Sequence, residues 1–262
     1  MGVRESSSGL QMLRPVRPRV GLCNNSSVLE TELIYAAIAR RPYPGRGLVM
    51  GRDADGVAFG LYWLTGRSTA SQRRKIVLGE LEIAVRDLSN GTPDELRHYT
   101  AAIRSTDCVM VGNGTQVQHL WDCVISGLSF EDAHRAISYE SDPPINTPRI
   151  TATASLKTGK ASDFLMSAAV SDPAWPTVAE HRSLHTQSVM PGQAQFVTTY
   201  SGDKKVPAAD GTPIGVKINT TWMSLMWEVW EALDPQLKVS IAAFPLESKS
   251  FLAGHSINKH SH

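Results

Sequence analysis

The sequence predicts an α+β fold in a single domain. Three observations favour it: helix and strand patterns come in separate blocks, they do not alternate strictly as strand–helix–strand units, and no internal repeat or long linker divides the chain. The length of 262 residues is ample to bury the core of one large domain. We expect this domain to span 25–248, between a flexible N-terminal segment at 1–24 and a flexible C-terminal tail at 249–262.

The first expected element is a helix that is followed by a hairpin. Ser27 with Glu30 three positions later makes a capping box, and apolar residues then recur at helical spacing. Two strand-like stretches come next, "RGLVMG" and "VAFGLYWLTG". The pair Asp55-Gly56 between them is a strong turn signal, so we expect a β-hairpin.

A second helix is expected in the middle of the chain, after one or two strands at "KIVLGELEIAVRDL". The stretch "TPDELRHYTAAIRS" has Thr92 as a cap, Pro93 at the first helical position and Glu95 closing the capping box. These signals predict that the helix runs through the whole stretch.

The remaining elements follow from the same two patterns. Short apolar runs bounded by turn residues predict strands, and apolar positions three or four apart predict helices. The helices are expected in two pieces across 116–138 and at "WMSLMWEVWEAL". The strands are expected at "CVMVGNG", "RITATASL", "QAQFVTTYSG" and "KVSIAAFPL".

Charge and cysteine content exclude several classes of protein. The net charge is +1, so we expect neither a nucleic acid nor a membrane as a partner. Cys23, Cys108 and Cys123 are odd in number and form no CxxC motif, which favours a reducing, cytoplasmic setting over a disulfide framework. No apolar run approaches the ~18 residues of a transmembrane helix.

Arginines and glycines gather in two loops that the hairpin brings together. The stretch "PYPGRG" places Arg46 between two glycines, and the loop after the hairpin carries Arg67, Ser68 and Arg74. Guanidinium forks and closely approaching backbone N–H groups suit a phosphate. Solvated turns with ordinary surface arginines explain the same residues, and both interpretations stay open at this point.

Two further polar stretches are candidates for a ligand site. In "VGNGTQ" the amides of Asn113 and Gln116 either face a ligand or belong to a simple turn. The stretch "YESDPPINTPRI" is a proline-rich loop that suits a substrate site or merely connects two elements. A carboxylate in such a loop can transfer protons when its pKa is tuned. The polar residues of this second stretch include Glu140, Asp142, Asn146 and Arg149.

Other motifs of known chemistry are weak or absent. His181 and His185 are four residues apart, but no HExxH motif occurs and acidic residues are not spaced around them as ligands would be. We therefore expect no metal site. Cys108 lies in an apolar strand and Cys123 on a helix, which is typical of small core residues.

Taken in order, the motifs resemble the IMP cyclohydrolase family of the archaeal type, including its bacterial relatives. The resemblance runs from about residue 36 to about residue 247, in the family's order. It implies a four-layer αββα sandwich similar to that of the N-terminal-nucleophile hydrolases, without their N-terminal nucleophile. The stretches that carry it are "RPYPGRGLVMG", "YWLTGRSTASQRR", "VGNGTQ", "YESDPPINTPRI" and "TTYSGDKKVPAADGTP".

The resemblance also implies the last ring closure of purine synthesis. The carboxamide nitrogen of FAICAR attacks the neighbouring formamido group, and water leaves to give IMP. The partner is then a small-molecule substrate, a nucleotide, and no metal or organic cofactor is required. Nucleophile and electrophile belong to one molecule, so positioning supplies much of the rate.

The site residues follow from matching this reaction to the motifs. Glu140 is expected to transfer protons, with Tyr62 as its partner. Tyr62 or the Asn113 amide is expected to donate to the developing oxyanion. The residues expected to bind the phosphate and the rest of the substrate are Arg46, Gly47, Arg67, Ser68, Arg74, Gln116, Asn146 and Arg149.

The sequence departs from the family's pattern at three positions near this site. Ala70 and Arg73 stand where bacterial members usually carry asparagine, and Thr115 stands where an aspartate is expected. Two alternatives therefore stay open: a diverged member that catalyses a different cyclisation or amide-type reaction in specialised metabolism, and a non-catalytic nucleotide-binding protein. The sequence also leaves open whether the protein is a homo-oligomer.

Overall fold

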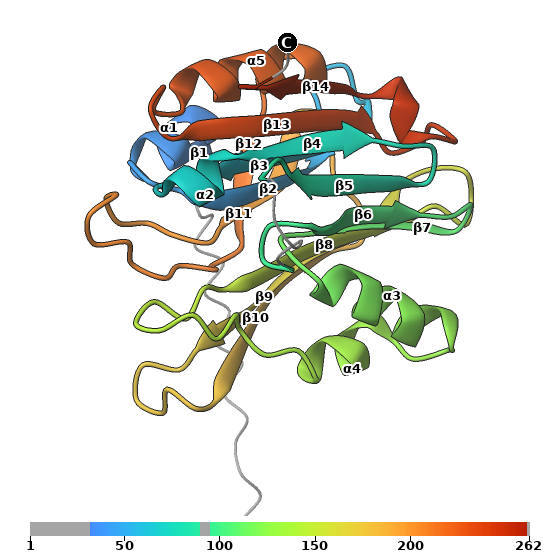
Figure 1. Ribbon diagram of the computed structural model, residues 1–262. Helices are drawn as coiled ribbons and strands as arrows, with labels where there is room; N and C mark the ends of the chain where they lie inside the picture. The colour runs from blue at the N-terminus through green and yellow to red at the C-terminus, as the bar shows by residue number, and fades with distance from the viewer. Residues whose placement is uncertain (1–31, 90–94, 261–262) are drawn as a thin grey trace, which may run out of the picture. The chain divides into compact units, whose positions relative to one another are not determined.

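The computed structural model describes residues 32–89 and 95–260, which belong to one compact unit, Thr31–His262. It has a mixed α+β fold with two seven-stranded sheets, which confirms the predicted fold class (Figure 1). The predicted segment at 1–24 and the capping residues Ser27, Glu30, Thr92 and Pro93 lie outside the described residues.

The first sheet has the strand order β1-β12-β11-β2-β3-β13-β14. Its neighbouring strands are antiparallel except β1 and β12, which are parallel. Every residue of β3 is buried, as its near-continuous apolar sequence "AFGLYWLT" predicts. The strands are β1 (Glu32–Leu33), β2 (Arg46–Arg52), β3 (Ala58–Thr65), β11 (Gln193–Thr198), β12 (Ile214–Lys217), β13 (Lys238–Pro245) and β14 (His255–Asn258).

The second sheet has the strand order β10-β9-β8-β7-β6-β5-β4, and all its neighbours are antiparallel. The connections follow the sequence from one edge of the sheet to the other, so consecutive strands are also neighbours. The strands are β4 (Arg74–Leu78), β5 (Glu82–Asp87), β6 (Tyr99–Arg104), β7 (Cys108–Gly112), β8 (Arg149–Ser155), β9 (Ser162–Ser171) and β10 (Ala179–Thr186).

Helices cover one face of each sheet. α1 (Ile34–Ala39) and α5 (Trp222–Ala232) share a hydrophobic cluster with the first sheet, and α3 (Gln116–Ile125) and α4 (Phe130–Arg135) share one with the second. The layers of this unit therefore run helix, sheet, sheet, helix (Figure 1). The similarity to the N-terminal-nucleophile hydrolases stays a prediction. Two short elements are α2 (Thr69–Gln72) and η1 (Phe251–Ala253).

The main core lies between the two sheets. Its cluster contains buried side chains of both, such as Leu48 and Tyr62 from the first sheet and Val111 and Met166 from the second. Burying one such apolar side chain contributes about 1.5–3 kcal/mol, so this interface is a major source of stability.

The predicted hairpin is confirmed, and Asp53 stabilises its turn. β2 pairs with β3 in antiparallel register, and the Asp53 carboxylate accepts hydrogen bonds from the backbone N–H groups of Asp55 and Val57 at 3.1 and 2.8 Å. Its other oxygen accepts from the Trp222 backbone N–H at 2.9 Å. The turn therefore also fixes the start of α5.

One predicted helix is a strand. The segment Tyr99–Arg104 forms β6, which pairs with β5 and β7 in the interior of the second sheet. The apolar residues of this segment fit both periods, and long-range pairing overrides the local helical signals. The strands β9 and β10 were not predicted at all.

The prediction of a flexible C-terminal tail at 249–262 is wrong for most of the residues that the structure describes there, 249–260. Phe251 is fully buried between the sheets, and β14 pairs with β13. Tertiary contacts order this segment although its sequence, "ESKSFLAGHSINKHSH", has only a weak strand pattern.

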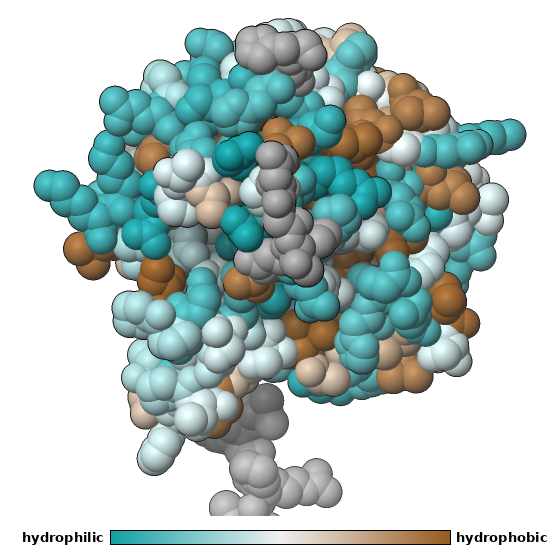
Figure 2. All heavy atoms as spheres, viewed as in Figure 1, coloured by the Kyte–Doolittle hydropathy of each residue, from teal (hydrophilic) through white to brown (hydrophobic). Residues whose placement is uncertain are grey.

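The surface in view is largely hydrophilic. Figure 2 shows polar residues over most of this face, while hydrophobic residues form separate patches. Among the helices of the described ranges, none combines the length and the apolar character that crossing a membrane requires.

Candidate active site

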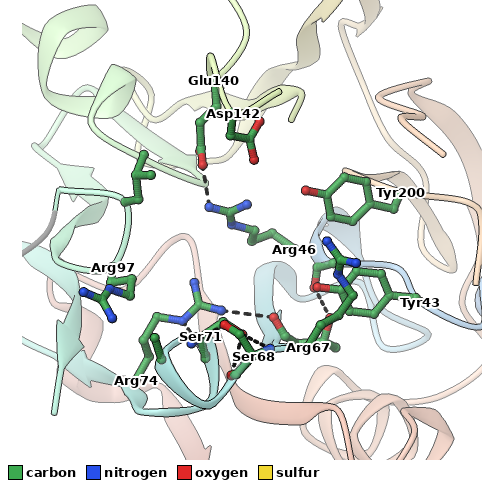
Figure 3. Close-up of a pocket in the computed structure, with 14 residues that line it drawn as sticks. Tyr43, Arg46, Arg67, Ser68, Ser71, Arg74, Arg97, Glu140, Asp142 and Tyr200 are labelled. Atoms are coloured by element: carbon green, nitrogen blue, oxygen red, sulfur yellow. Dashed lines mark hydrogen bonds and ion pairs between the residues drawn. The ribbon is translucent and has the colours of Figure 1, made fainter. Parts of the chain in front are cut away.

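A pocket of about 690 Å³ opens beside the start of β2 and the end of β3 (Figure 3). This volume lies within the roughly 300–1,000 Å³ of small-molecule sites. The loop that carries Glu140 and Asp142 borders it on the opposite side. The described lining residues are Tyr43, Gly45, Arg46, Thr65, Arg67, Ser68, Ala70, Ser71, Arg74, Leu96, Arg97, Glu140, Asp142 and Tyr200.

Gly45 fixes the loop that delivers Arg46 to the pocket. Its φ of +68° is unfavourable for other residues, and a Cβ at this position would lie 2.2 Å from Thr199 Oγ1. The Arg46 backbone N–H donates to the same hydroxyl at 3.0 Å. The "PYPGRG" loop is therefore held against the segment that follows β11.

Glu140 lies between two arginines at the wall of the pocket. Its Oε2 atom is 3.3 Å from Arg46 Nη2 and 3.2 Å from Arg149 Nη1. Burial by itself lowers the pKa of Arg46, but the charge of Glu140 and nearby tyrosines outweigh it and raise the pKa overall. Burial also lowers the pKa of Arg149, and the charge of Glu140 offsets only part of that effect.

Arg74 is a buried cation whose hydrogen-bond partners are neutral. Its Nε donates to the Ser71 carbonyl at 2.8 Å and its Nη2 to the Thr65 carbonyl at 3.0 Å. No carboxylate of the described ranges forms an ion pair with it. Burial lowers the pKa of Arg74, and the charge of Arg46 lowers it further. A buried guanidinium that forms no ion pair with a described carboxylate would be stabilised by an anion in the pocket.

Arg67 belongs to a stack of rings at the rim. Its guanidinium lies 5.4 Å from the centre of the Tyr43 ring, and Tyr43 stacks on Tyr200 with centroids 5.4 Å apart. The exposed Arg67 also donates to the Lys204 carbonyl at 3.2 Å. Such stacking holds Arg67 at the entrance while its charge stays in contact with solvent.

A chain of hydroxyl groups links the carboxylate of Asp142 to Tyr200. The Thr147 hydroxyl donates to Asp142 Oδ2 at 2.7 Å and is in hydrogen-bond contact with the Tyr200 hydroxyl. Because an ionised carboxylate only accepts, the Thr147 proton points to Asp142 and Tyr200 must donate to Thr147. Asp142 is therefore already engaged in fixing the wall of the pocket.

The pocket carries an excess of positive charge. Its described lining contains four arginines and two carboxylates, so the net charge of these residues is +2. Arg97 is additionally paired with Asp87, its Nε lying 3.2 Å from Asp87 Oδ2. The local charge suits an anionic ligand, although the whole chain is almost neutral.

The structure brings five of the predicted site residues together around one cavity. They come from the start of β2, from the loop after β3, from the start of β4 and from the loop before β8. These five are Arg46, Arg67, Ser68, Arg74 and Glu140.

Tyr62 lies behind the pocket. It is fully buried and its hydroxyl is 2.7 Å from the Tyr99 hydroxyl. Burial and the neighbouring Tyr99 raise the pKa of Tyr62 well above its usual value. Tyr62 is thus a neutral hydroxyl that bonds to another tyrosine, and it does not line the cavity.

Asn113 and Gln116 also lie outside the pocket lining. The Asn113 carbonyl oxygen accepts from the Ile150 backbone N–H at 2.9 Å and from Gln116 Nε2 at 2.8 Å. The Asn113 amide nitrogen donates to the Pro148 carbonyl at 2.8 Å. The "VGNGTQ" stretch therefore holds the chain at the start of β8.

Gly47, Asn146 and Arg149 complete the predicted set. A Cβ on Gly47 would lie 2.0 Å from the Trp63 ring, so this glycine makes room for a core side chain. Asn146 has a φ of 52° and its amide donates to Ser171 Oγ at 3.4 Å. None of the three lines the pocket, and Arg149 contacts it only through Glu140.

Several lining residues were not predicted as site residues. Tyr43, Ser71 and Tyr200 lie inside the motifs that carry the family resemblance, so those motifs were the available signal. Arg97 lay in a segment that was predicted as a helix, and its sequence context gave no sign of a ligand site.

Only one of the three departures from the family's pattern reaches the cavity. Ala70 lines it, whereas Arg73 is exposed and donates to the Leu88 carbonyl at 3.3 Å. Thr115 is exposed at the start of α3 and does not line it. In the described part of the chain, no three His, Cys, Asp or Glu side chains are arranged to hold a metal ion.

Comparison with known proteins places the chain in a family. None of the curated proteins compared with it matches. The family described as "IMP cyclohydrolase-like protein" matches residues 43–249, a range that includes every lining residue of the pocket. This range is well over half of the 262 residues, and the chain therefore belongs to the IMP cyclohydrolase-like family.

Proposed function

We propose that the chain is a cyclohydrolase that closes the ring of FAICAR to give IMP and water. One observation carries the proposal: in the pocket, a buried arginine that forms no ion pair with a carboxylate of the described residues shares the cavity with a carboxylate. A nucleotide substrate needs the first group for its phosphate, and the ring closure needs the second for its protons.

The phosphate is assigned to the end of the pocket around Arg74. Among the residues that the structure describes, Arg74 bonds to two neutral carbonyl groups, and the hydroxyl-bearing residues Ser68 and Ser71 line the same end. Arg46 is a poorer candidate, because Glu140 already pairs with it at 3.3 Å. A dianionic phosphate beside Arg74 supplies the missing counter-charge and forms charge-assisted hydrogen bonds.

The reacting atoms are assigned to the end around Glu140. The carboxamide nitrogen forms a bond to the formyl carbon and loses a proton, which Glu140 accepts. Glu140 returns this proton to the formyl oxygen, which becomes a hydroxyl group. The carbon–oxygen bond then breaks: the hydroxyl leaves as water with the proton of the formamido nitrogen, which Glu140 transfers, and a carbon–nitrogen double bond forms in the ring. Arg46 donates hydrogen bonds to the formyl oxygen while negative charge develops on that oxygen. The guanidinium of Arg46 is placed for this role because it borders the pocket beside Glu140.

A second candidate is a ring closure or amide-type reaction on a different substrate. The observation in its favour is Ala70, which lines the pocket where the family resemblance leads us to expect asparagine. The exposed positions of Arg73 and Thr115 weaken the case, since neither residue can contact a ligand in this cavity.

The test is turnover of FAICAR by the purified protein, followed by the absorbance of the purine ring. Wild-type protein is expected to convert FAICAR, and an Arg74→Ala variant to lose activity. Arg73→Ala is the matched control, because its side chain is exposed and lies outside the pocket. A folded protein that binds IMP without turnover points to the second candidate or to a binding protein; one that does neither contradicts the proposal.

A further inference from the structure

Gly114 leaves a space that the side chain of Arg149 fills. A Cβ at residue 114 would lie 1.7 Å from Arg149 Nη1 and 2.9 Å from Arg149 Cζ, and real Cβ atoms do not approach within 3.0 Å. The φ of Gly114 is not in the left-handed region, so alanine is compatible with the backbone. A side chain at this position therefore conflicts chiefly with the guanidinium of Arg149.

Gln116 borders the same space. Its Oε1 lies 2.9 Å from the position that a Cβ of residue 114 would take, and it is buried with no hydrogen-bond partner in the ranges that the structure describes. Asn113 holds Gln116 by accepting from its Nε2 at 2.8 Å. Gly114 and Gln116 thus border a socket for Arg149, and Asn113 fixes Gln116 in place.

Arg149 extends from this socket to Glu140. Its Nη1 is 3.2 Å from Glu140 Oε2, the same atom that lies 3.3 Å from Arg46 Nη2. The other titratable groups with electrostatic effects on this arginine are Tyr99 and Asp142. Arg149 does not line the cavity, so its effect on a substrate must pass through Glu140.

We propose that Gly114 and Arg149 are positioning residues, which fix the carboxylate of Glu140 between two cations at the wall of the pocket. The bare Cα of Gly114 admits the guanidinium, and the guanidinium holds Glu140 Oε2. The kinetic consequence rests on the proposed function, in which Glu140 accepts the proton. The "VGNGTQ" stretch then contributes to the reaction without touching the substrate.

The kinetic test compares Gly114→Ala, Arg149→Met and Arg149→Lys with Thr115→Ala as the control from the same loop. Gly114→Ala and Arg149→Met are expected to lower kcat about tenfold with little change in KM, because a small displacement of a reacting group slows the reaction without weakening binding. Arg149→Lys, which keeps a cation, should retain more activity, and Thr115→Ala should match wild type.

A second measurement needs no turnover. Crystal structures of Gly114→Ala and Arg149→Met show directly where the carboxylate of Glu140 lies. In wild type its Oε2 atom is 3.2 Å from Arg149 Nη1 and 3.3 Å from Arg46 Nη2. In both variants the carboxylate should leave this position, whereas Thr115→Ala should keep it there. An unchanged position of Glu140 together with unchanged kcat overturns the proposal. If wild type does not convert FAICAR but Glu140 is displaced in the two variants, the positioning role stands and the proposed function fails.

Discussion

Two polar stretches of the chain use their side chains in opposite ways. In "GRSTASQRR" the residues Arg67, Ser68 and Arg74 line the pocket. In "VGNGTQ" the amides of Asn113 and Gln116 are buried and bond to the chain at the start of β8. In sequence the two stretches look equally suited to a ligand. What separates them in the structure is access to the cavity: Arg67, Ser68 and Arg74 line it, whereas the amides of Asn113 and Gln116 do not.

The largest effect is expected at Glu140. This residue lines the pocket and also pairs with Arg149, which lies behind the pocket lining. Glu140→Gln is expected to lower kcat by about 100- to 1,000-fold, because the amide keeps the shape but cannot accept the proton. The Kd of IMP, measured by calorimetry, should change by less than the rate does. A variant with nearly wild-type kcat contradicts the role of Glu140 as the base.

Arg74 tests the lining residues. Arg74→Ala is expected to weaken IMP binding about 100-fold, since a charge-assisted hydrogen bond to a phosphate is worth about 1.5–3 kcal/mol. Calorimetry with IMP and with inosine, which lacks the phosphate, measures the effect. Inosine affinity should change little, and an equal loss for both ligands would show that Arg74 supports the fold of the pocket and does not bind the phosphate.

Asn113 tests the role of the "VGNGTQ" stretch in holding the chain at the start of β8. Asn113→Ala should reduce the free energy of unfolding by about 2 kcal/mol, because the buried Ile150 N–H and Pro148 carbonyl lose their partner. Chemical denaturation measures this loss, with Gln118→Ala on the exposed face of α3 as a control. If the stability is unchanged and IMP binding is lost, Asn113 faces the ligand after all.

Arg67 should give the smallest effect. Its side chain is exposed and bonds to a backbone carbonyl, and exposed charges contribute about 0–1 kcal/mol. Arg67→Ala is therefore expected to weaken IMP binding only about threefold, with a larger difference at low salt. If Arg67→Ala weakened IMP binding as much as Arg74→Ala does, the phosphate would have to bind at the rim beside Arg67.

The sequence was sufficient to identify residues that converge across the hairpin. Glycine spacing and the Asp55-Gly56 turn predicted that Arg46 and Arg67 would come together, because register in a hairpin is set locally. The sequence alone could not distinguish polar side chains that are enclosed in the protein from those that line the cavity. Asn113 and Arg74 are both polar residues beside a turn, and only the packing of β8 against β7 decides that Asn113 is enclosed.

The errors in secondary structure have the same origin. The segment of β6 has alanines that suit either a helix or a strand, and its pairing with β5 and β7 decides between them. β9 pairs with β8 and β10 over its length, although the alanines and serines of its sequence, "SDFLMSAAVS", favour a strand only weakly. Contacts between distant segments thus determine elements whose local signals are balanced.

The contact between Asn258, near the C-terminus, and Ile76 in β4 has a consequence for folding during synthesis. The amide of Asn258 accepts from the Ile76 backbone N–H at 2.8 Å and donates to the Ile76 carbonyl at 3.2 Å, so it covers the edge strand β4. The two residues are 182 positions apart. A ribosome therefore completes β4 long before its cover exists, and an uncovered edge strand invites pairing with another chain. We expect nascent chains to depend on rapid completion of synthesis, or on a chaperone, until β14 emerges.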